Sequence, residues 1–170
     1  MEREDIVAAI VAAAGGKLVG RVRLQKTAYL LDQRGLNSGF DYEYHHYGPY
    51  SRDLDNAMLD AWAFGLVDES FDRRESDGAR YSIFSLQPGA SAKDEAFGKL
   101  GRDRAAALIQ KFANINVTVL ELAATIDWLW RKEGYSDWRT ELTRRKGAKV
   151  QGGRLEQAIN LLNEIGLPPP

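Results

Sequence analysis

Residues 40–54 read FDYEYHHYGPYSRDL, and this stretch joins a predicted strand, a corner and the start of a helix. From Phe40 to Tyr47, side chains of two kinds alternate with a period of two, which is the pattern of a half-buried strand. We expect Pro49 to end this strand, because proline lacks the N–H group that strand pairing uses. Ser51 has the side chain of a helix N-cap, so the next helix is predicted over 52–64.

The two histidines of the chain stand next to each other in this stretch. Neighbouring side chains of a strand point to opposite faces, so His45 and His46 are poorly placed to bind one metal ion. A Ser-His-Asp arrangement can be drawn from Ser51, His46 and Asp53, but Ser51 already has a capping role and lies in no nucleophile elbow. The sequence therefore predicts no catalytic residue, no metal site and no cofactor.

Outward from this stretch, the spacing of apolar residues predicts further helices and a hairpin. The expected elements are helices over 3–14 and 22–34, short strands over 66–70 and 81–86 with a mobile charged tip, a helix from Phe97 to Phe112, a helix capped by Asn114 or Asn116, a short helix capped by Ser136, and a last helix around 155–162. We predict one α+β, mainly α domain over 1–170. Its winged-helix-like half covers 1–88 and its helical portion covers 93–166.

The composition is that of a folded globular protein, with 44% hydrophobic and 28% charged residues. Lys and Arg total 23 against 24 Asp and Glu, so the net charge of -1 creates no general attraction for nucleic acid. The chain has no cysteine, which excludes disulfides and thiolate nucleophiles. The acidic start MEREDIVAAIVAAAGG predicts an amphipathic helix of a cytoplasmic protein, and no apolar run approaches the roughly 18 residues of a membrane span.

Basic residues gather near the end of the chain, and they are candidates for contact with nucleic acid: Arg144, Arg145, Lys146 and Lys149. In a winged helix, the helix over 52–64 would enter the major groove of DNA. That segment carries three aspartates against the single Arg52, which suits DNA poorly. The architecture is therefore predicted to serve protein binding.

Two motifs resemble a known family. RLQKTAYLLDQRG followed by YEYHHYGPYSRDL resembles the Leu-Gln-Lys helix and the Tyr-Gly-Pro corner of the Panacea (SocA-like) antitoxin domains and of the related YwgA-like bacterial proteins. LELAATIDWLW and RRKGAKVQGGRLEQAINLLNEIGL are more similar to the YwgA-like branch, so the resemblance covers most of the chain. For Panacea domains it implies a mainly helical antitoxin that neutralises a separately encoded toxin by direct contact, sometimes as an adaptor for proteolysis.

We therefore predict a non-catalytic, antitoxin-like interaction module that is not an enzyme and binds a protein of a bacterial toxin or stress system. The predicted partner-binding residues are Gln25, Lys26, Tyr29, Tyr47, Tyr50 and Arg52, and the structural motif residues are Leu24, Gly48, Pro49 and Ser51. One alternative is a winged-helix DNA-binding regulator that uses the basic C-terminal segment and the 68–80 hairpin. A weaker alternative is a hydrolase or nuclease centred on His45 or His46.

Overall fold

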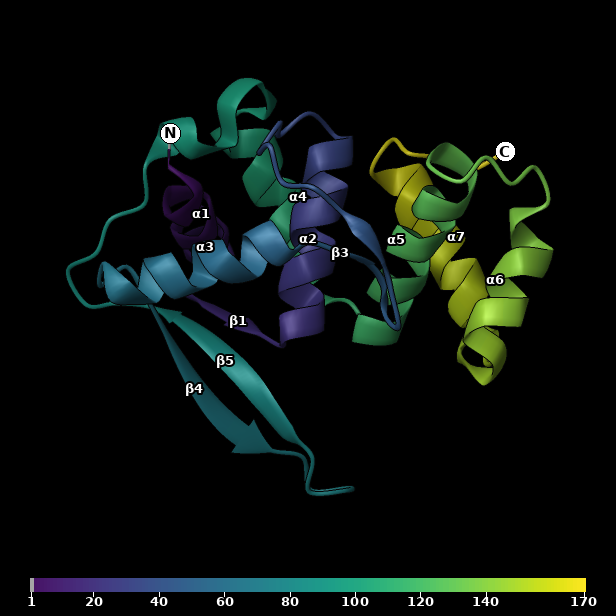
Figure 1. The fold of residues 1–170 in the computed structure, drawn as a ribbon, viewed down its shortest axis with the longest axis horizontal. Helices are drawn as coiled ribbons and strands as arrows, with labels where there is room; N and C mark the ends of the chain where they lie inside the picture. Colours follow the sequence, from purple (N-terminus) through teal and green to yellow (C-terminus); the bar gives the residue numbers. More distant parts are fainter. Residues whose placement is uncertain (1) are drawn as a thin grey trace.

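The computed structural model describes residues 2–170 as helices packed around a small antiparallel sheet (Figure 1). The α-helices are α1 (Arg3–Ala13), α2 (Arg21–Gln33), α3 (Arg52–Ala63), α4 (Arg102–Asn114), α5 (Val117–Arg131), α6 (Trp138–Lys146) and α7 (Arg154–Glu164). The strands are β1 (Lys17–Val19), β2 (Glu43–His45), β3 (Gly48–Tyr50), β4 (Val67–Arg73) and β5 (Arg80–Leu86), and two 3-10 helices are η1 (Asp94–Leu100) and η2 (Gly147–Val150). The predicted α+β, mainly α class is confirmed.

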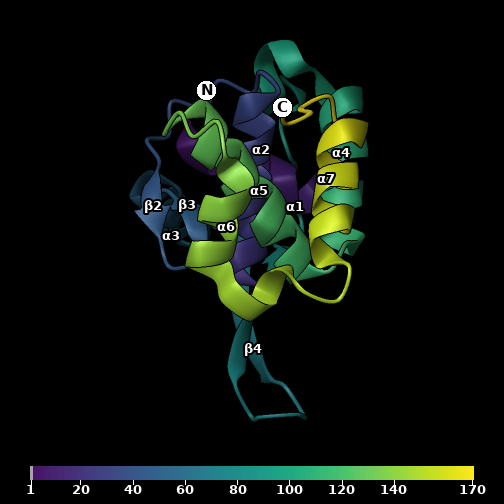
Figure 2. The same cartoon turned by 90° about the vertical axis from the view of Figure 1, so that its right-hand side faces the viewer.

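The N-terminal half has the topology of a winged helix. Its three-stranded sheet has the order β1-β5-β4, so the first strand pairs with the last one. The sequence did not predict β1, because three residues are too few for an alternating pattern to stand out. Leu18 of β1 is buried opposite Phe84 of β5. The β4–β5 hairpin, here called the wing, projects from the helical body in both views (Figures 1 and 2).

The strand predicted from Phe40 to Tyr47 forms only over Glu43–His45, and the expectation that Pro49 ends it is wrong. The structure instead has a hairpin in which β2 and β3 pair antiparallel, with Tyr44 opposite Pro49 and His45 opposite Gly48. Gly48 has a φ of +92°, which a side-chain-bearing residue rarely adopts, and this lets the chain reverse after His46 and Tyr47. Proline is tolerated in this two-stranded sheet because every strand is an edge strand.

The helix predictions were right where local signals are strong. The hydroxyl of Ser51 caps α3 by accepting from the Leu54 N–H at 3.3 Å, as expected. Asn116, one of two candidates, caps α5 by accepting from the N–H groups of Thr118 and Val119. Two predictions were wrong: Asp137, not Ser136, caps α6, and the helix expected from Phe97 is broken into η1 and α4. Gly98 and Gly101 cause this break, because both adopt a positive φ.

One apolar core runs through both halves of the chain. Helix α5 lies at its centre and packs against α2, α6, α7 and β3 (Figure 2). Almost every residue from Val119 to Leu129 is therefore buried, including the polar Glu121, Thr125 and Asp127. Among the helices of residues 2–170, none combines the length and apolar character needed to cross a membrane.

Candidate functional site

Helix α2 and the Tyr-Gly-Pro corner are joined by buried hydrogen bonds. The Lys26 ammonium donates to the Pro49 carbonyl oxygen at 2.6 Å. The Gln25 side chain donates to the Ser51 carbonyl at 2.8 Å and accepts from the Ser51 N–H at 2.8 Å. These side chains satisfy backbone groups of Pro49 in β3 and of Ser51 directly after it, which have no further strand beside them. The two motifs that stand apart in the sequence thus form one structural unit.

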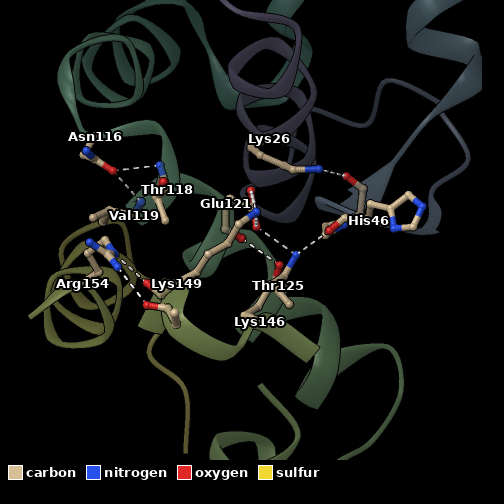
Figure 3. Close-up of polar contacts among 12 residues, drawn as sticks. Lys26, His46, Asn116, Thr118, Val119, Glu121, Thr125, Lys146, Lys149 and Arg154 are labelled. Carbon is tan, nitrogen blue, oxygen red and sulfur yellow. Dashed lines mark hydrogen bonds and ion pairs between the residues drawn. The ribbon is translucent and has the colours of Figure 1, made fainter. Parts of the chain in front are cut away.

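Three lysines surround one buried carboxylate beneath this corner, and we call Lys26, Lys146, Lys149 and Glu121 the lysine cluster (Figure 3). Glu121 pairs with Lys146 at 2.9 Å and with Lys149 at 3.0 Å. Lys146 also donates to the His46 carbonyl at 3.0 Å. Burial lowers the pKa of Lys26 to about 7, with Glu121 acting in the opposite direction and the other two lysines adding to the decrease. The cluster has more positive than negative groups.

A cavity of about 300 Å³ lies beside α2, and we call it the inner cavity. Its surface is mostly apolar, and His45 stacks on Tyr50 there with ring centroids 4.3 Å apart. Asp55, which also lines it, accepts from the Tyr50 hydroxyl at 2.5 Å and from Gln25 at 3.2 Å. The hydrogen bond to Asp55 raises the pKa of Tyr50. The cavity therefore has an aromatic wall and a carboxylate that accepts hydrogen bonds.

A second, more polar hollow of about 550 Å³ lies at the base of the wing, and we call it the wing groove. Arg21, Val22 and Tyr47 line both hollows, so the two lie next to each other. Four cationic side chains line the wing groove against the single carboxylate of Glu121: Arg21, Arg74, Arg80 and Lys149. Tyr47 is 53% exposed, with the Lys149 ammonium 4.8 Å from its ring centroid. The groove thus combines positive charge with aromatic surface.

A third hollow lies along α3, where large apolar side chains face outward. Leu59 and Trp62 line it, and both are more than half exposed. Arg21, Asp55 and Glu69 line it as well. Glu69 pairs with Arg21 at 2.9 Å and accepts from the Ser82 hydroxyl at 2.6 Å. This face is therefore apolar with an acidic border.

The predicted partner-binding residues fall into two groups. Gln25, Lys26 and Tyr29 are buried, and Tyr29 donates to Asp127 at 2.8 Å inside the core. The exposed Tyr47 and Arg52 and the half-buried Tyr50 are therefore the members of this set that can contact a macromolecule directly. Leu24, Gly48, Pro49 and Ser51 are all buried at the unit that joins α2 to the corner. Binding by any of these residues stays a prediction.

The four residues of the predicted basic surface form ion pairs with carboxylates of the same chain. Arg144 and Arg145 both bind Glu141, and Arg145 also binds Glu133 at 2.7 Å. These hydrogen bonds lower the pKa of Glu141 to about 2. Lys146 and Lys149 pair with Glu121, as described above. Carboxylates thus offset the charges of all four residues. Only Arg144 and Lys149 among them have substantially exposed side chains, at 68% and 40%.

Sequence reasoning missed Arg21, Arg74 and Arg80 as residues of one groove. In the sequence, Arg74 and Arg80 lie in the segment FDRRESDGAR, in which three basic and three acidic residues cancel. In the structure the two arginines have different partners. Arg74 pairs with Asp77 at 2.9 Å, whereas the Arg80 guanidinium lies over the Phe71 ring at 4.2 Å. The available signal was the aromatic Phe71 within a hairpin that carries three arginines.

His45 and His46 are both exposed in the β2–β3 hairpin region. His45 contacts Glu43 at 2.9 Å on the exposed face of the hairpin. Among residues 2–170, His, Cys, Asp and Glu side chains form no group of three or more that could hold a metal ion.

No family model matches the chain. Over 129 residues it is 32% identical to a DNA ADP-ribosyl glycohydrolase from Thermus aquaticus, and the match covers 72% of this chain and 34% of that protein. The chain thus spans about a third of the length of this relative. The match overturns two expectations, because the relative carries the name of an enzyme: the prediction of a non-catalytic, antitoxin-like module is wrong, and so is the prediction that the protein is not an enzyme.

Proposed function

We propose that this protein acts in the hydrolytic removal of ADP-ribose from DNA, and that its own residues hold the substrate. The observation that carries the proposal is the similarity over 129 residues to the Thermus aquaticus DNA ADP-ribosyl glycohydrolase. The relative is much longer than the match, so we assign substrate binding to this chain and assign no residue to bond cleavage.

The wing groove supports contact with DNA. Proteins bind the phosphate backbone with Arg and Lys side chains, and they stack unpaired bases on aromatic rings. Arg80 is suited to the first task because, among the residues that the structure describes, no carboxylate pairs with it. Tyr47 is suited to the second task because its ring is exposed at the junction with the inner cavity.

Helix α3 does not support the DNA contact that a winged helix usually makes. Asp53, Asp55 and Asp60 place negative charge on it, which repels phosphates. We therefore propose that DNA approaches the base of the wing. A protein partner stays a prediction, and the exposed Leu59, Trp62 and Phe64 form the apolar surface best suited to one.

Membership of the Panacea or YwgA-like families also stays a proposal. It rests on the two quoted motifs, and the hydrogen bonds from Gln25 and Lys26 to the corner give those motifs a common structural role. We keep the predicted cytoplasmic location as part of the proposal, because DNA is present in that compartment of a bacterium.

The proposal is tested with a short single-stranded oligonucleotide that carries one ADP-ribose group and with the same oligonucleotide unmodified. We expect the purified protein to bind the modified strand about tenfold more tightly, measured by fluorescence polarisation, which corresponds to about 1.4 kcal/mol. Release of ADP-ribose is measured by chromatography in the same samples and would place bond cleavage in this chain. Equal affinity for the two strands, with no release, would overturn the proposal.

A further inference from the structure

We infer that a second copy of this chain pairs with the outer edge of β4, so that two three-stranded sheets join into one antiparallel sheet. The pairing is two-fold symmetric and is centred on Phe71 of each copy. This inference goes beyond the proposed function and does not depend on it. Three features of the wing support it: a free edge, backbone groups that point outward from that edge, and charges that complement those of a second copy in one register.

The outer edge of β4 has no neighbouring strand. The sheet order β1-β5-β4 places β4 at one end, and the wing projects from the helical body (Figures 1 and 2). Every residue from Ser70 to Arg73 is exposed. The strand contains no proline and no lysine, two residues with which natural edge strands block pairing with another chain. β4 therefore presents an edge that another strand can extend.

Alternate residues of β4 direct their backbone N–H and C=O groups to this edge. The N–H of Arg74 donates to the Ala79 carbonyl, and the N–H of Gln87 donates to the Leu66 carbonyl, each at 2.9 Å. Hydrogen-bonded residues alternate along an antiparallel pair, so the even-numbered residues of β4 bond to β5. The odd-numbered residues therefore point their backbone groups away from β5.

The outward N–H groups of two of these residues have only local partners. The N–H of Glu69 donates to the Asp68 carboxylate at 3.1 Å, and the N–H of Arg73 donates to the Asp72 carboxylate at 2.8 Å. Both contacts are exposed and join adjacent residues, so a strand beside β4 can replace them. In a pair centred on Phe71, Glu69 would exchange backbone hydrogen bonds with Arg73 of the second copy.

Charge favours this register. When Phe71 lies opposite its own copy, Glu69 lies opposite Arg73 and Asp68 lies opposite Arg74. The two-fold axis repeats each contact, so every charge that faces a charge has the opposite sign. Arg73 is available for this contact, because no carboxylate among residues 2–170 pairs with it.

Neighbouring registers bring like charges together. A pair centred on Ser70 would place Asp68 opposite Asp72, and a pair centred on Asp72 would place Glu69 opposite Glu75. A pair centred on Glu69 would place that residue opposite its own copy. Like charges directly opposite each other destabilise a sheet. The sequence of β4 thus distinguishes one register from its neighbours.

Phe71 supplies apolar contact at the centre of the pair. It is 47% exposed, and the Arg80 guanidinium of β5 lies over its ring at 4.2 Å. Aromatic side chains that lie opposite each other on adjacent strands stabilise a sheet. In the joined sheet the two rings would shield each other from water, and each would keep its cation.

The test is sedimentation velocity of the purified protein over a range of concentrations. We expect a monomer–dimer equilibrium with a Kd of about 10 to 100 µM, because one strand edge is smaller than a standard interface. Asp68→Arg and Arg74→Asp each place like charges opposite each other, so each should dimerise at least about tenfold more weakly. An equimolar mixture of these two variants should form a heterodimer, because opposite charges then face each other again. Arg102→Asp is the matched control, since the Arg102 side chain is also exposed and ion-paired.

Disulfide formation tests the register. Because the chain has no cysteine, Phe71→Cys introduces a single thiol. Hydrogen-bonded partners of an antiparallel pair have Cα atoms about 5.5 Å apart, which a disulfide can span. Under mild oxidation Phe71→Cys should form covalent dimers at least about tenfold faster than Ser70→Cys, which would lie opposite Asp72.

Circular dichroism establishes that each variant is folded before it is compared. A monomer at every concentration would overturn the inference and would leave the edge to an extended segment of another protein. A dimer that neither charge variant weakens, or that their mixture does not restore, would refute the β4 contact. Faster cross-linking of Ser70→Cys would refute the register. The proposed function is tested separately, by the preference for the ADP-ribosylated oligonucleotide, so either idea can fail without the other.

Discussion

Lys26 of α2 donates a hydrogen bond of 2.6 Å to the carbonyl oxygen of Pro49 in β3, and Lys26 is only 1% exposed. An ammonium group is costly to bury, so its retention here requires compensating contacts. The carbonyl of Pro49 and the nearby carboxylate of Glu121 provide them. The stability of the corner therefore depends on the protonation of one lysine.

Lys26→Met is expected to reduce the pH dependence of stability. The pKa of Lys26 is about 7 in the folded protein and near 10.5 in the unfolded chain, so the unfolded chain binds more protons between these values. Lys26 should consequently raise the free energy of unfolding between pH 7 and pH 9, by up to about 1.4 kcal/mol per pH unit. Burial also lowers the pKa of Lys146, which adds to the same trend.

Urea unfolding at several values between pH 7 and pH 9 measures this effect. The rise should be smaller in Lys26→Met than in the unaltered protein, and it should be unchanged in the variant of an exposed lysine, Lys132→Met. Staying below pH 10 avoids the tyrosines Tyr29 and Tyr42, whose raised pKa values would reduce stability at higher pH. If the free energy of unfolding rose equally with pH in the unaltered protein and in Lys26→Met, the prediction would be contradicted.

Gly48→Ala is expected to destabilise the protein by about 3 kcal/mol, because two costs add. The residue has a φ of +92°, and a Cβ atom there would collide with the Thr125 side chain of α5. Gly89→Ala is the matched control: its φ is +82°, but no atom lies within 4 Å of the new Cβ, so only the backbone strain of about 1 kcal/mol remains. Chemical denaturation compares the two variants.

Adding Thr125→Ala to Gly48→Ala tests the steric part by itself. The second change removes the hydroxyl that the new Cβ meets, so the double variant should lose less stability than the sum of the single variants. Strict additivity would show that the backbone conformation alone causes the cost.

Tyr29→Phe is expected to cost about 1 to 2 kcal/mol, since it removes one hydrogen bond to the buried Asp127. Asp127→Ala should cost more, about 3 to 5 kcal/mol, because it also leaves Gln33 and Arg131 without their carboxylate. The exposed Tyr135→Phe serves as the control in the same thermal or urea unfolding series. Similar losses for Tyr29→Phe and Asp127→Ala would contradict this account of the network.

Arg80→Ala is expected to weaken binding of the ADP-ribosylated oligonucleotide and to reduce its salt dependence. Loss of one phosphate contact should lower the slope of log affinity against log salt concentration by about 1. Arg139→Ala is a close control, because the Arg139 guanidinium also lies over an aromatic ring, that of Trp138, at 4.7 Å. Identical salt slopes for the two variants would exclude the wing groove as the DNA contact.

Local sequence signals predicted much of the fold. Helices α1, α2 and α3 begin and end within one residue of the expected positions, because apolar spacing, glycine and the Ser51 cap act over a few residues. The β2–β3 hairpin escaped prediction, because nothing local indicates that Pro49 can pair with Tyr44 when no further strand lies beside it.

The candidate site was less predictable than the fold. The aromatic stretch around His45 and Tyr47 stands out in the sequence, and it does line the inner cavity. The sequence does not indicate that Glu121 binds Lys146 and Lys149 beneath that stretch, or that Arg80 joins Arg21 in one groove. These residues lie on different elements, and only the packing of those elements brings them together.

The sequence by itself determined the class of the protein, the main helices and the wing, since hydrophobic periodicity and capping are encoded within each segment. The tertiary structure alone decided which charges are free and which are paired. Arg145 was a candidate for contact with nucleic acid and is held by Glu133 and Glu141, whereas Arg80, which the sequence marked only as part of the 68–80 hairpin, has no carboxylate partner among residues 2–170. The physical reason is that ion pairing depends on distances of a few ångströms between residues that can be far apart in the chain.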